Sequence, residues 1–150
     1  MELIAISQTG EPAQPIAGLP ELAASIGSAY GQLYRAGGFL PPWLGYFALE
    51  DGVCIGTCGF KGPPVSRRVE IAYFTFPEYE GRGCATRMAR ALLRIARETD
   101  AAVIVTAQTL PRESASTAIL RKLGFVLLGS VNHPEDGEVW EWQAATSELF

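Results

Sequence analysis

The chain has 150 residues, 48% of them hydrophobic and 19% charged, so its length suits one buried core and a single domain over residues 1–150. A net charge of −4 argues against a broad nucleic-acid-binding face, and we expect no nucleic-acid partner. The sequence has no secretory leader pattern and no apolar run of about 18 residues, which predicts a cytoplasmic protein without a membrane partner. Its cysteines, Cys54, Cys58 and Cys84, form neither an even disulfide set nor a metal-ligand cluster, so we expect reduced thiols and no metal.

The amino-terminal third predicts a strand at residues 3–7, a helix at 20–36, and paired strands at 46–50 and 53–60. Asp51-Gly52 between the paired strands is the signal of a two-residue hairpin turn. The helix is expected to bury the apolar residues that recur at steps of three or four: Leu22, Ile26, Ala29, Tyr30 and Leu33.

The rest of the chain alternates between strand and helix patterns. The expected elements are a strand at residues 69–76, an amphipathic helix at 84–99, a strand at 101–106, a helix at 114–123 ended by Gly124, and closing strands at 125–131 and 139–142. The fold class that follows is α/β, a mixed sheet with helices on both faces.

The most informative segment is residues 69–86, where a strand runs into glycines that open a helix. Unpaired N–H groups and the helix dipole make such a junction able to bind an anion, and a pyrophosphate suits it. Gly81 and Gly83 allow close approach and positive φ, and the small Ala85 lets the helix start near a ligand. Taken alone, however, these glycines favour a plain strand-to-helix loop.

A second motif decides between these interpretations, because together the two motifs resemble the GNAT acyltransferase superfamily. Residues 80–85, Glu-Gly-Arg-Gly-Cys-Ala, are similar to the family's coenzyme loop Gln/Arg-x-x-Gly-x-Gly/Ala except at the first position. Residues 110–125 resemble its later element, in which an Ala-Ser pair opens a helix ending Leu-x-Lys-x-Gly-Phe. The resemblance covers residues 43–142. It implies a mostly antiparallel twisted sheet with a central parallel pair splayed at a β-bulge.

The chain departs from the family pattern at two places. Glu80 replaces the usual Gln or Arg, and we expect this carboxylate to turn outward or cap the next helix while Arg82 offsets its charge. Glu113 and Ser114 stand where the family often has an asparagine, which leaves Ser116 as a donor or as the residue that opens the helix.

The resemblance implies acetyl-CoA as the co-substrate. Its contacts are expected from residues in the fourth strand and in the glycine loop: the backbones of Tyr73, Phe74 and Thr75, together with Gly81, Arg82, Gly83, Cys84, Ala85 and Thr86. The side chains of Tyr73 and Phe74 are expected to pack in the core. A backbone N–H near Phe74 is the expected oxyanion donor.

The resemblance also implies Glu70 as the general base, drawing a proton from the amine directly or through water. The alternative is an edge carboxylate in water or one paired with Arg67 or Arg68. Arg121 occupies the position of a tyrosine acid found in some members, so Ser116 or water is left to reprotonate the thiolate.

Together these features predict direct transfer of an acetyl group to a primary amine, on a protein amino terminus or a small molecule, in a monomer or homodimer. The motifs resemble the branch that contains the ribosomal-protein alanine acetyltransferases. The alternatives are a non-catalytic acyl-CoA sensor and a structural domain without coenzyme. An acidic stretch either attracts a cationic amine or is a solvated loop: Glu135, Asp136, Glu138 and Glu141.

Overall fold

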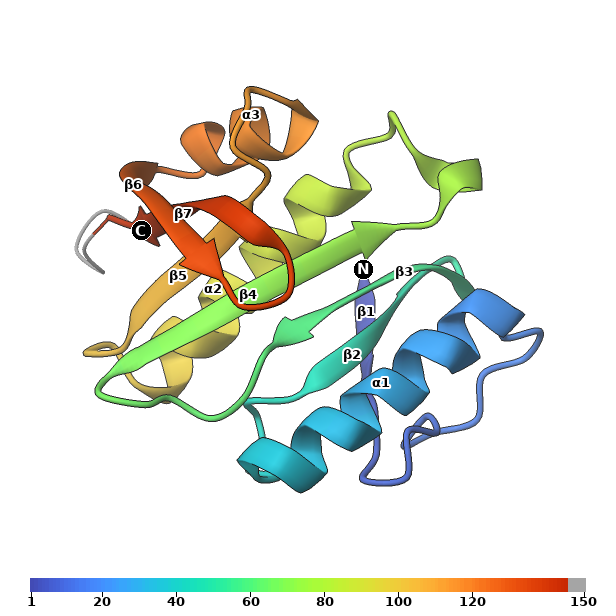
Figure 1. The fold of residues 1–150 in the computed structure, drawn as a ribbon. Helices are drawn as coiled ribbons and strands as arrows, with labels where there is room; N and C mark the ends of the chain where they lie inside the picture. Colours follow the sequence, from blue (N-terminus) through green and yellow to red (C-terminus); the bar gives the residue numbers. More distant parts are fainter. Residues whose placement is uncertain (146–150) are drawn as a thin grey trace.

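A computed structural model describes residues 1–145 of the chain, and Figure 1 shows the arrangement of their helices and strands. The element bounds are β1 (Glu2–Ala5), α1 (Glu21–Gly37), β2 (Gly45–Glu50), β3 (Val53–Phe60), β4 (Arg68–Thr75), the 3-10 turn η1 (Pro77–Tyr79), α2 (Cys84–Thr99), β5 (Ile104–Thr109), α3 (Ala115–Lys122), β6 (Phe125–His133) and β7 (Gly137–Ala144). None of the helices within the described residues is both long enough and apolar enough to cross a membrane.

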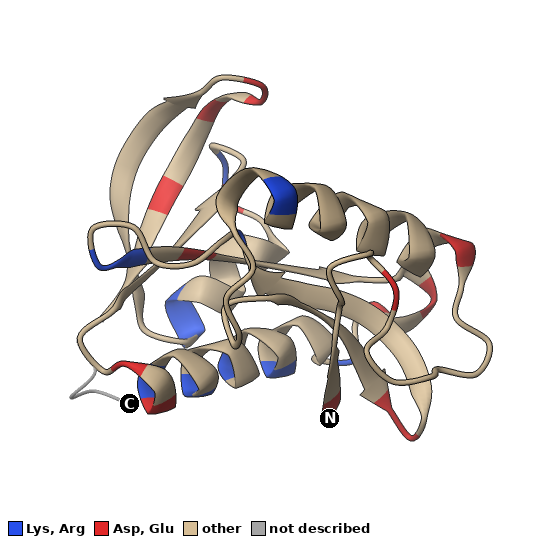
Figure 2. Cartoon of the chain, turned by 90° about the horizontal axis from the view of Figure 1, so that it is seen from below, with Lys and Arg blue, Asp and Glu red and all other residues tan. Residues whose placement is uncertain are grey.

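The strands form one seven-stranded sheet in the order β1-β2-β3-β4-β5-β7-β6. All neighbouring strands in it run antiparallel except β4 and β5, which run parallel. Seen along the edge of the sheet in Figure 2, α1 covers one face and α2 covers the other. The predicted α/β class, with a mixed sheet and helices on both faces, is confirmed.

The central parallel pair is splayed. Strands β4 and β5 pair only from Arg68/Ile104 to Ile71/Ala107, although β4 continues to Thr75 and β5 to Thr109. The ladder between β3 and β4 runs without a register shift, and shifts occur instead between Ala48 and Leu49 and between Leu127 and Gly129. The opening between β4 and β5 therefore forms while β4 stays in register with β3.

Local turn signals located most boundaries correctly. Asp51 and Gly52 both have positive φ, at 51° and 79°, as a two-residue hairpin turn requires. Gly124, with φ of 89°, follows the end of α3. The strand expected at residues 101–106 begins later, at Ile104, because the Asp100 carboxylate accepts a hydrogen bond from the Ala102 N–H (3.0 Å) and holds a turn there.

The buried face of α1 differs from the predicted one. Leu22 and Leu33 are 43% and 42% exposed, respectively. The residues that face the core are Ala23, Gly27, Tyr30, Gly31 and Tyr34. A Cβ at Gly27 would lie 2.3 Å from the Gly10 carbonyl oxygen, so glycine lets the helix touch the preceding loop. Hydrophobic periodicity gives no weight to glycine, and it therefore placed the exposed Leu22 and Leu33 in the core, although Tyr30 is buried as predicted.

We expect Gly27→Ala to destabilise the fold, because the added methyl group has to displace backbone. Overpacking of this kind costs about 1–3 kcal/mol, which corresponds to a melting temperature lower by about 2–10 °C. Gly37→Ala is the matched control, since a Cβ at that position of the same helix meets nothing within 4 Å. Thermal melts showing equal stability for the two variants would contradict close packing at Gly27.

Helix α2 buries the stripe expected from its sequence. Its buried residues are Cys84, Met88, Ala89, Leu92, Leu93 and Ala96. Figure 2 shows its basic residues along the side that faces away from the sheet. The helix packs against β3 and β4, which brings its amino-terminal end beside the open end of the β4–β5 pair.

Candidate functional site

The amino-terminal end of α2 is left open by the backbone. Gly81 and Gly83 have φ of 77° and 76°, and Gly83, the N-cap of α2, is left-handed and provides no side-chain cap. The first helical hydrogen bond of α2 runs from the Arg87 N–H to the Gly83 carbonyl oxygen (3.1 Å). The N–H groups of the first turn are therefore available to a ligand. In α3, by contrast, Ser114 and Thr117 close the amino-terminal end with a capping box.

A cavity of about 580 Å³ lies between this end of α2, the splayed end of β4 and the start of α3. Nine residues that the sequence predicted for the site line it: Tyr73, Phe74, Thr75, Gly81, Gly83, Cys84, Ala85, Thr86 and Ser116. The lining residues that sequence reasoning missed are Tyr79, Ala115 and Ile119, and Glu80, which was expected to turn outward or cap α2, also lines the cavity. Helical spacing could have found Ile119, since it lies three and four residues after Ser116 and Ala115.

Arg82 does not line this cavity. Its guanidinium carbon lies 5.7 Å from the centre of the Tyr79 ring, in a cation–π contact. Among the described residues no ion pair joins Arg82 to Glu80. The exposed Glu80 lines the cavity, and a bound pyrophosphate would be held mainly by backbone N–H groups.

The backbone phase of β4 decides which of its groups face the opening. The backbone N–H and C=O groups of the even-numbered residues of β4 point toward β3. Two hydrogen bonds of 2.9 Å show this: the Lys61 N–H donates to the Glu70 carbonyl, and the Phe76 N–H donates to the Ile55 carbonyl. Phe74 shares this phase and pairs with Thr57. The backbones of Tyr73 and Thr75 thus face the opening, whereas the Phe74 N–H faces β3, so the oxyanion donor expected near Phe74 is assigned to one of its two neighbours in β4.

The side chains of Tyr73 and Phe74 have different environments. Tyr73 packs against the core as predicted, and burial raises the pKa of its phenol to about 12. Phe74 does not pack in the core, since it is 43% exposed and contacts Phe76 with ring centres 5.9 Å apart. Alternation along β4 puts Phe74 on the same face as Glu70, the side opposite the buried Val69 and Ile71.

A smaller cavity of about 100 Å³ adjoins the first and contains Glu70. Tyr73 and Ser116 line both cavities and so mark where they meet. The Lys61 Nζ lies 2.6 Å from the Glu70 Oε2, an oxygen that is buried and has no well-oriented hydrogen bond among the described residues. The contact is therefore an ion pair rather than a directed hydrogen bond.

Glu70 forms its ion pair with Lys61. The alternative interpretation had paired it with Arg67 or Arg68, and neither arginine fills that role. Arg68 instead approaches Glu141 at 3.7 Å and donates a hydrogen bond to the Gln143 side chain at 3.4 Å. Lys61 follows directly after β3 and meets Glu70 across the β3–β4 ladder. Cross-strand neighbours of this kind follow from register, which a single-sequence pattern does not provide.

The structure removes one of the two roles left open for Ser116, that of the residue that caps α3. The residue that caps α3 is Ser114, whose side chain accepts a hydrogen bond from the Thr117 N–H (3.4 Å). Ser116 is exposed and lines both cavities, which leaves its hydroxyl available as a donor. Arg121, at the position of the absent tyrosine, forms an ion pair with Glu113 and lies over the Trp142 ring at 4.9 Å.

Cys84 is buried at the start of α2, and burial together with a hydrogen bond to Glu50 raises the pKa of its thiol. The nearby guanidinium groups of Arg87 and Arg82 would lower this pKa, but burial outweighs them. We therefore expect Cys84 to remain a protonated thiol at neutral pH and not to carry an acetyl group. Mass spectrometry after mixing with acetyl-CoA should show no acetylated Cys84, and Cys84→Ser should turn over normally. Accumulation of that thioester, with loss of turnover in Cys84→Ser, would contradict this.

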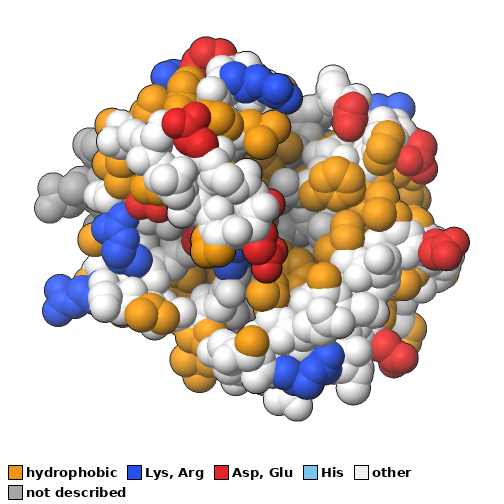
Figure 3. All heavy atoms as spheres, in the orientation of Figure 1, with side chains coloured by type: hydrophobic (Ala, Val, Ile, Leu, Met, Phe, Trp, Pro, Cys, Tyr) orange, Lys and Arg blue, Asp and Glu red, His pale blue; other side chains and the backbone are white. Residues whose placement is uncertain are grey.

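The hairpin of β6 and β7 crosses in front of β4 (Figure 1), and Figure 3 shows acidic side chains near the centre of this face. At the tip, the His133 Nδ1 accepts hydrogen bonds from the Glu135 and Asp136 N–H groups, both 3.2 Å. Because Glu141 approaches Arg68, the acidic stretch is not a uniformly solvated loop.

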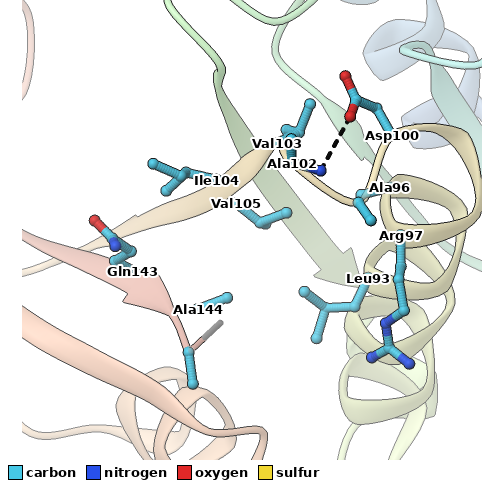
Figure 4. A pocket seen from close by; sticks show the side chains of 12 residues that line it. Leu93, Ala96, Arg97, Asp100, Ala102, Val103, Ile104, Val105, Gln143 and Ala144 are labelled. Carbon is cyan, nitrogen blue, oxygen red and sulfur yellow. Dashed lines mark hydrogen bonds between the residues drawn. The ribbon is translucent and has the colours of Figure 1, made fainter. Parts of the chain in front are cut away.

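A separate cavity of about 290 Å³ lies at the opposite end of α2 (Figure 4). It is lined mainly by small and apolar residues, among them Leu93, Ala96 and Val105, with Arg97 at its edge. No residue of the glycine loop or of the Glu70 cavity contributes to it. The chemistry-bearing residues converge on the other two cavities.

Solved structures support the same architecture. The ribosomal L7/L12 alpha-N-protein acetyltransferase RimL, solved with coenzyme A, is 16% identical with a TM-score of 0.66, over 85% of this chain and 73% of that protein. The yncA protein of Salmonella typhimurium, solved with acetyl-CoA, is 19% identical with a TM-score of 0.61, over 80% and 72%. The ribosomal-protein-S5-alanine acetyltransferase of Vibrio fischeri is 17% identical with a TM-score of 0.61, over 69% of this chain and 61% of that protein.

At these identities the structures establish the fold alone. A search of curated proteins found no match. The family model of the acetyltransferase (GNAT) domain, however, matches residues 23–126, which is 104 of the 150 residues and includes β4, the glycine loop, α2 and α3. The chain therefore belongs to the GNAT acetyltransferase family.

Proposed function

We propose that this chain transfers an acetyl group from acetyl-CoA directly to a primary amine, and that it does so as a single domain. One observation carries the proposal: the cavity at the open end of α2 meets the Glu70 cavity at Tyr73 and Ser116. An acyl donor and an amine placed in the two cavities would come together at that junction. A single core cluster that includes residues of α1, α2 and α3 supports one domain.

The lining of the larger cavity suits the coenzyme chemically. A Cβ at Gly81 would meet nothing within 4 Å, so the loop leaves open space beside its backbone. The uncapped N–H groups of Cys84, Ala85 and Thr86 would hold the pyrophosphate at the positive end of the helix dipole. The gap-facing N–H and C=O groups of Tyr73 and Thr75 would bind the pantetheine amides, as an added strand would.

The smaller cavity supplies the groups for proton transfer. Glu70 would take the proton of the acceptor ammonium, directly or through one water, once that ammonium replaces Lys61 at the carboxylate. The N–H groups of Tyr73 or Thr75 would stabilise the oxyanion of the acetyl carbonyl. Ser116 or water would return a proton to the thiolate. Tyr73 also lines this cavity, but burial raises the pKa of its phenol to about 12, which makes it a weaker acid than an ordinary tyrosine.

The acceptor class is tested most directly with amines of two kinds. RimL and the Vibrio fischeri protein are named as ribosomal-protein acetyltransferases, which makes peptide amino termini the first acceptors to try and small-molecule amines the second. The acidic hairpin beside the cavity favours acceptors with additional positive charge.

The experiment mixes the protein with acetyl-CoA and an amine panel, and follows free thiol together with the mass of each amine. Transfer should appear as thiol release that depends on an amine and is matched by an acetylated product. Slow hydrolysis of acetyl-CoA without any product would instead support the sensor, an alternative favoured by the existing Lys61–Glu70 pair. Absence of CoA binding in calorimetry would refute both.

A further inference from the structure

The end of β2 and the glycine loop, which are distant in sequence, meet at one guanidinium group, that of Arg87 in α2. The Arg87 Nη2 donates a hydrogen bond to the Glu50 Oε1 at 2.5 Å, and the Arg87 Nη1 donates another to the Arg82 carbonyl oxygen at 3.0 Å. The same Nη2 lies 3.4 Å from the Cys84 Sγ. Glu50 is the last residue of β2, so Arg87 connects the sheet, the loop and the first turn of α2.

The contact with the Arg82 carbonyl fixes the peptide between Arg82 and Gly83. In a trans peptide the carbonyl and the following N–H point in opposite directions, so a carbonyl turned toward Arg87 directs the Gly83 N–H away from it. If this peptide turned over, a carbonyl oxygen would replace an N–H on the other side of the loop. An oxygen there would repel an anion that the N–H would bind.

The packing around Gly83 leaves little room for another arrangement. A Cβ at Gly83 would lie 3.1 Å from the Arg87 Nη1, so the guanidinium lies directly against the loop backbone. The Cys84 thiol is a weak donor toward the Glu50 Oε1 (3.5 Å) and the Tyr79 carbonyl (3.8 Å), which adds contacts to the same cluster. Glu50 is held ionised, since the hydrogen bond from Arg87 lowers the pKa of its carboxyl.

We propose that Arg87 is a positioning residue that holds the Arg82–Gly83 peptide in its anion-binding orientation, and that Glu50 holds Arg87 in place. The inference rests on the proposed function, because it assumes that the coenzyme's pyrophosphate binds at this loop. Arg87 does not line the cavity, which distinguishes this role from direct contact with phosphate.

The first test compares two acyl donors in Arg87→Met. S-acetylpantetheine lacks the pyrophosphate, so its KM should change less than twofold, whereas the KM for acetyl-CoA and the Kd for CoA should rise on the order of tenfold or more. A general loss of stability would affect both donors alike. Arg90→Met is the matched control: it removes the same charge from an exposed position one turn further along α2, and it should leave both KM values unchanged.

Glu50→Ala distinguishes positioning from direct binding. If Arg87 only orients the loop, the loss of its partner should weaken CoA binding in the same direction as Arg87→Met, and the double variant should be no worse than Arg87→Met alone. If Arg87 binds phosphate itself, releasing it from Glu50 should leave CoA affinity equal or tighter. That second result would overturn the proposal.

Arg87→Lys provides a variant that keeps the charge if Arg87→Met folds poorly. A lysine cannot reach Glu50 and the Arg82 carbonyl together as a planar guanidinium does, so it should also weaken CoA binding selectively. Unchanged CoA affinity in a folded Arg87→Lys or Arg87→Met variant would refute the positioning role. Failure of the proposed function would look different, because the unaltered protein would then not bind CoA.

Discussion

Gly83→Val is expected to reduce coenzyme A affinity by about a hundredfold or more while the rest of the fold persists. Gly83 has φ of 76°, a region in which a β-branched residue is strained by about 1–3 kcal/mol. The added side chain would also meet the Arg87 Nη1 at 3.1 Å, which disturbs the group that orients the loop. The N–H groups at the start of α2 would then no longer converge on one point.

Calorimetric titration with CoA measures this effect, and a thermal melt shows whether the variant is folded. Gly18→Val is the matched control, because Gly18 has a similar positive φ of 66° but lies outside the cavity, with nothing within 4 Å of an added Cβ. That variant should show the cost of strain alone and keep its CoA affinity. A folded Gly83→Val protein with the same Kd as the unaltered chain would refute the placement of the pyrophosphate at this loop.

Glu70→Gln is expected to lower kcat/KM for the acceptor amine by about a hundredfold, the usual contribution of a general base. The amide cannot accept the ammonium proton, yet it has nearly the same shape as the carboxylate. With Glu70 present, kcat/KM should rise with pH, as expected when a base takes a proton from an alkylammonium, and the variant should lose this profile. Stability should change little, because the Lys61–Glu70 pair is partly exposed.

The measurement is kcat/KM across pH on the amine that proves active, with thermal melts for both variants. Glu138→Gln, in the exposed part of the acidic hairpin, is the control for the loss of one negative charge near the acceptor. If Glu70→Gln melts normally and keeps both its rate and its pH profile, Glu70 is a surface carboxylate. The base would then be water or a residue of the hairpin.

Features that depend on neighbouring residues could be predicted from the sequence by itself. The Asp51-Gly52 turn, the buried stripe of α2 and the end of α3 at Gly124 follow from local backbone preferences and from helical periodicity. The glycine loop and the helix that follows it could be predicted for the same reason. Nine of the residues predicted for the site consequently line one cavity.

Features that depend on register and close packing were decided only by the tertiary structure. Gly10 selects the buried face of α1 by meeting Gly27, and β3 turns the backbone of Phe74 away from the opening by keeping β4 in register. Lys61 reaches Glu70 across a ladder, and Arg87 reaches Glu50 from another element. Each is a contact between segments whose relative position is set by the whole core, and local propensity contains no information about such contacts.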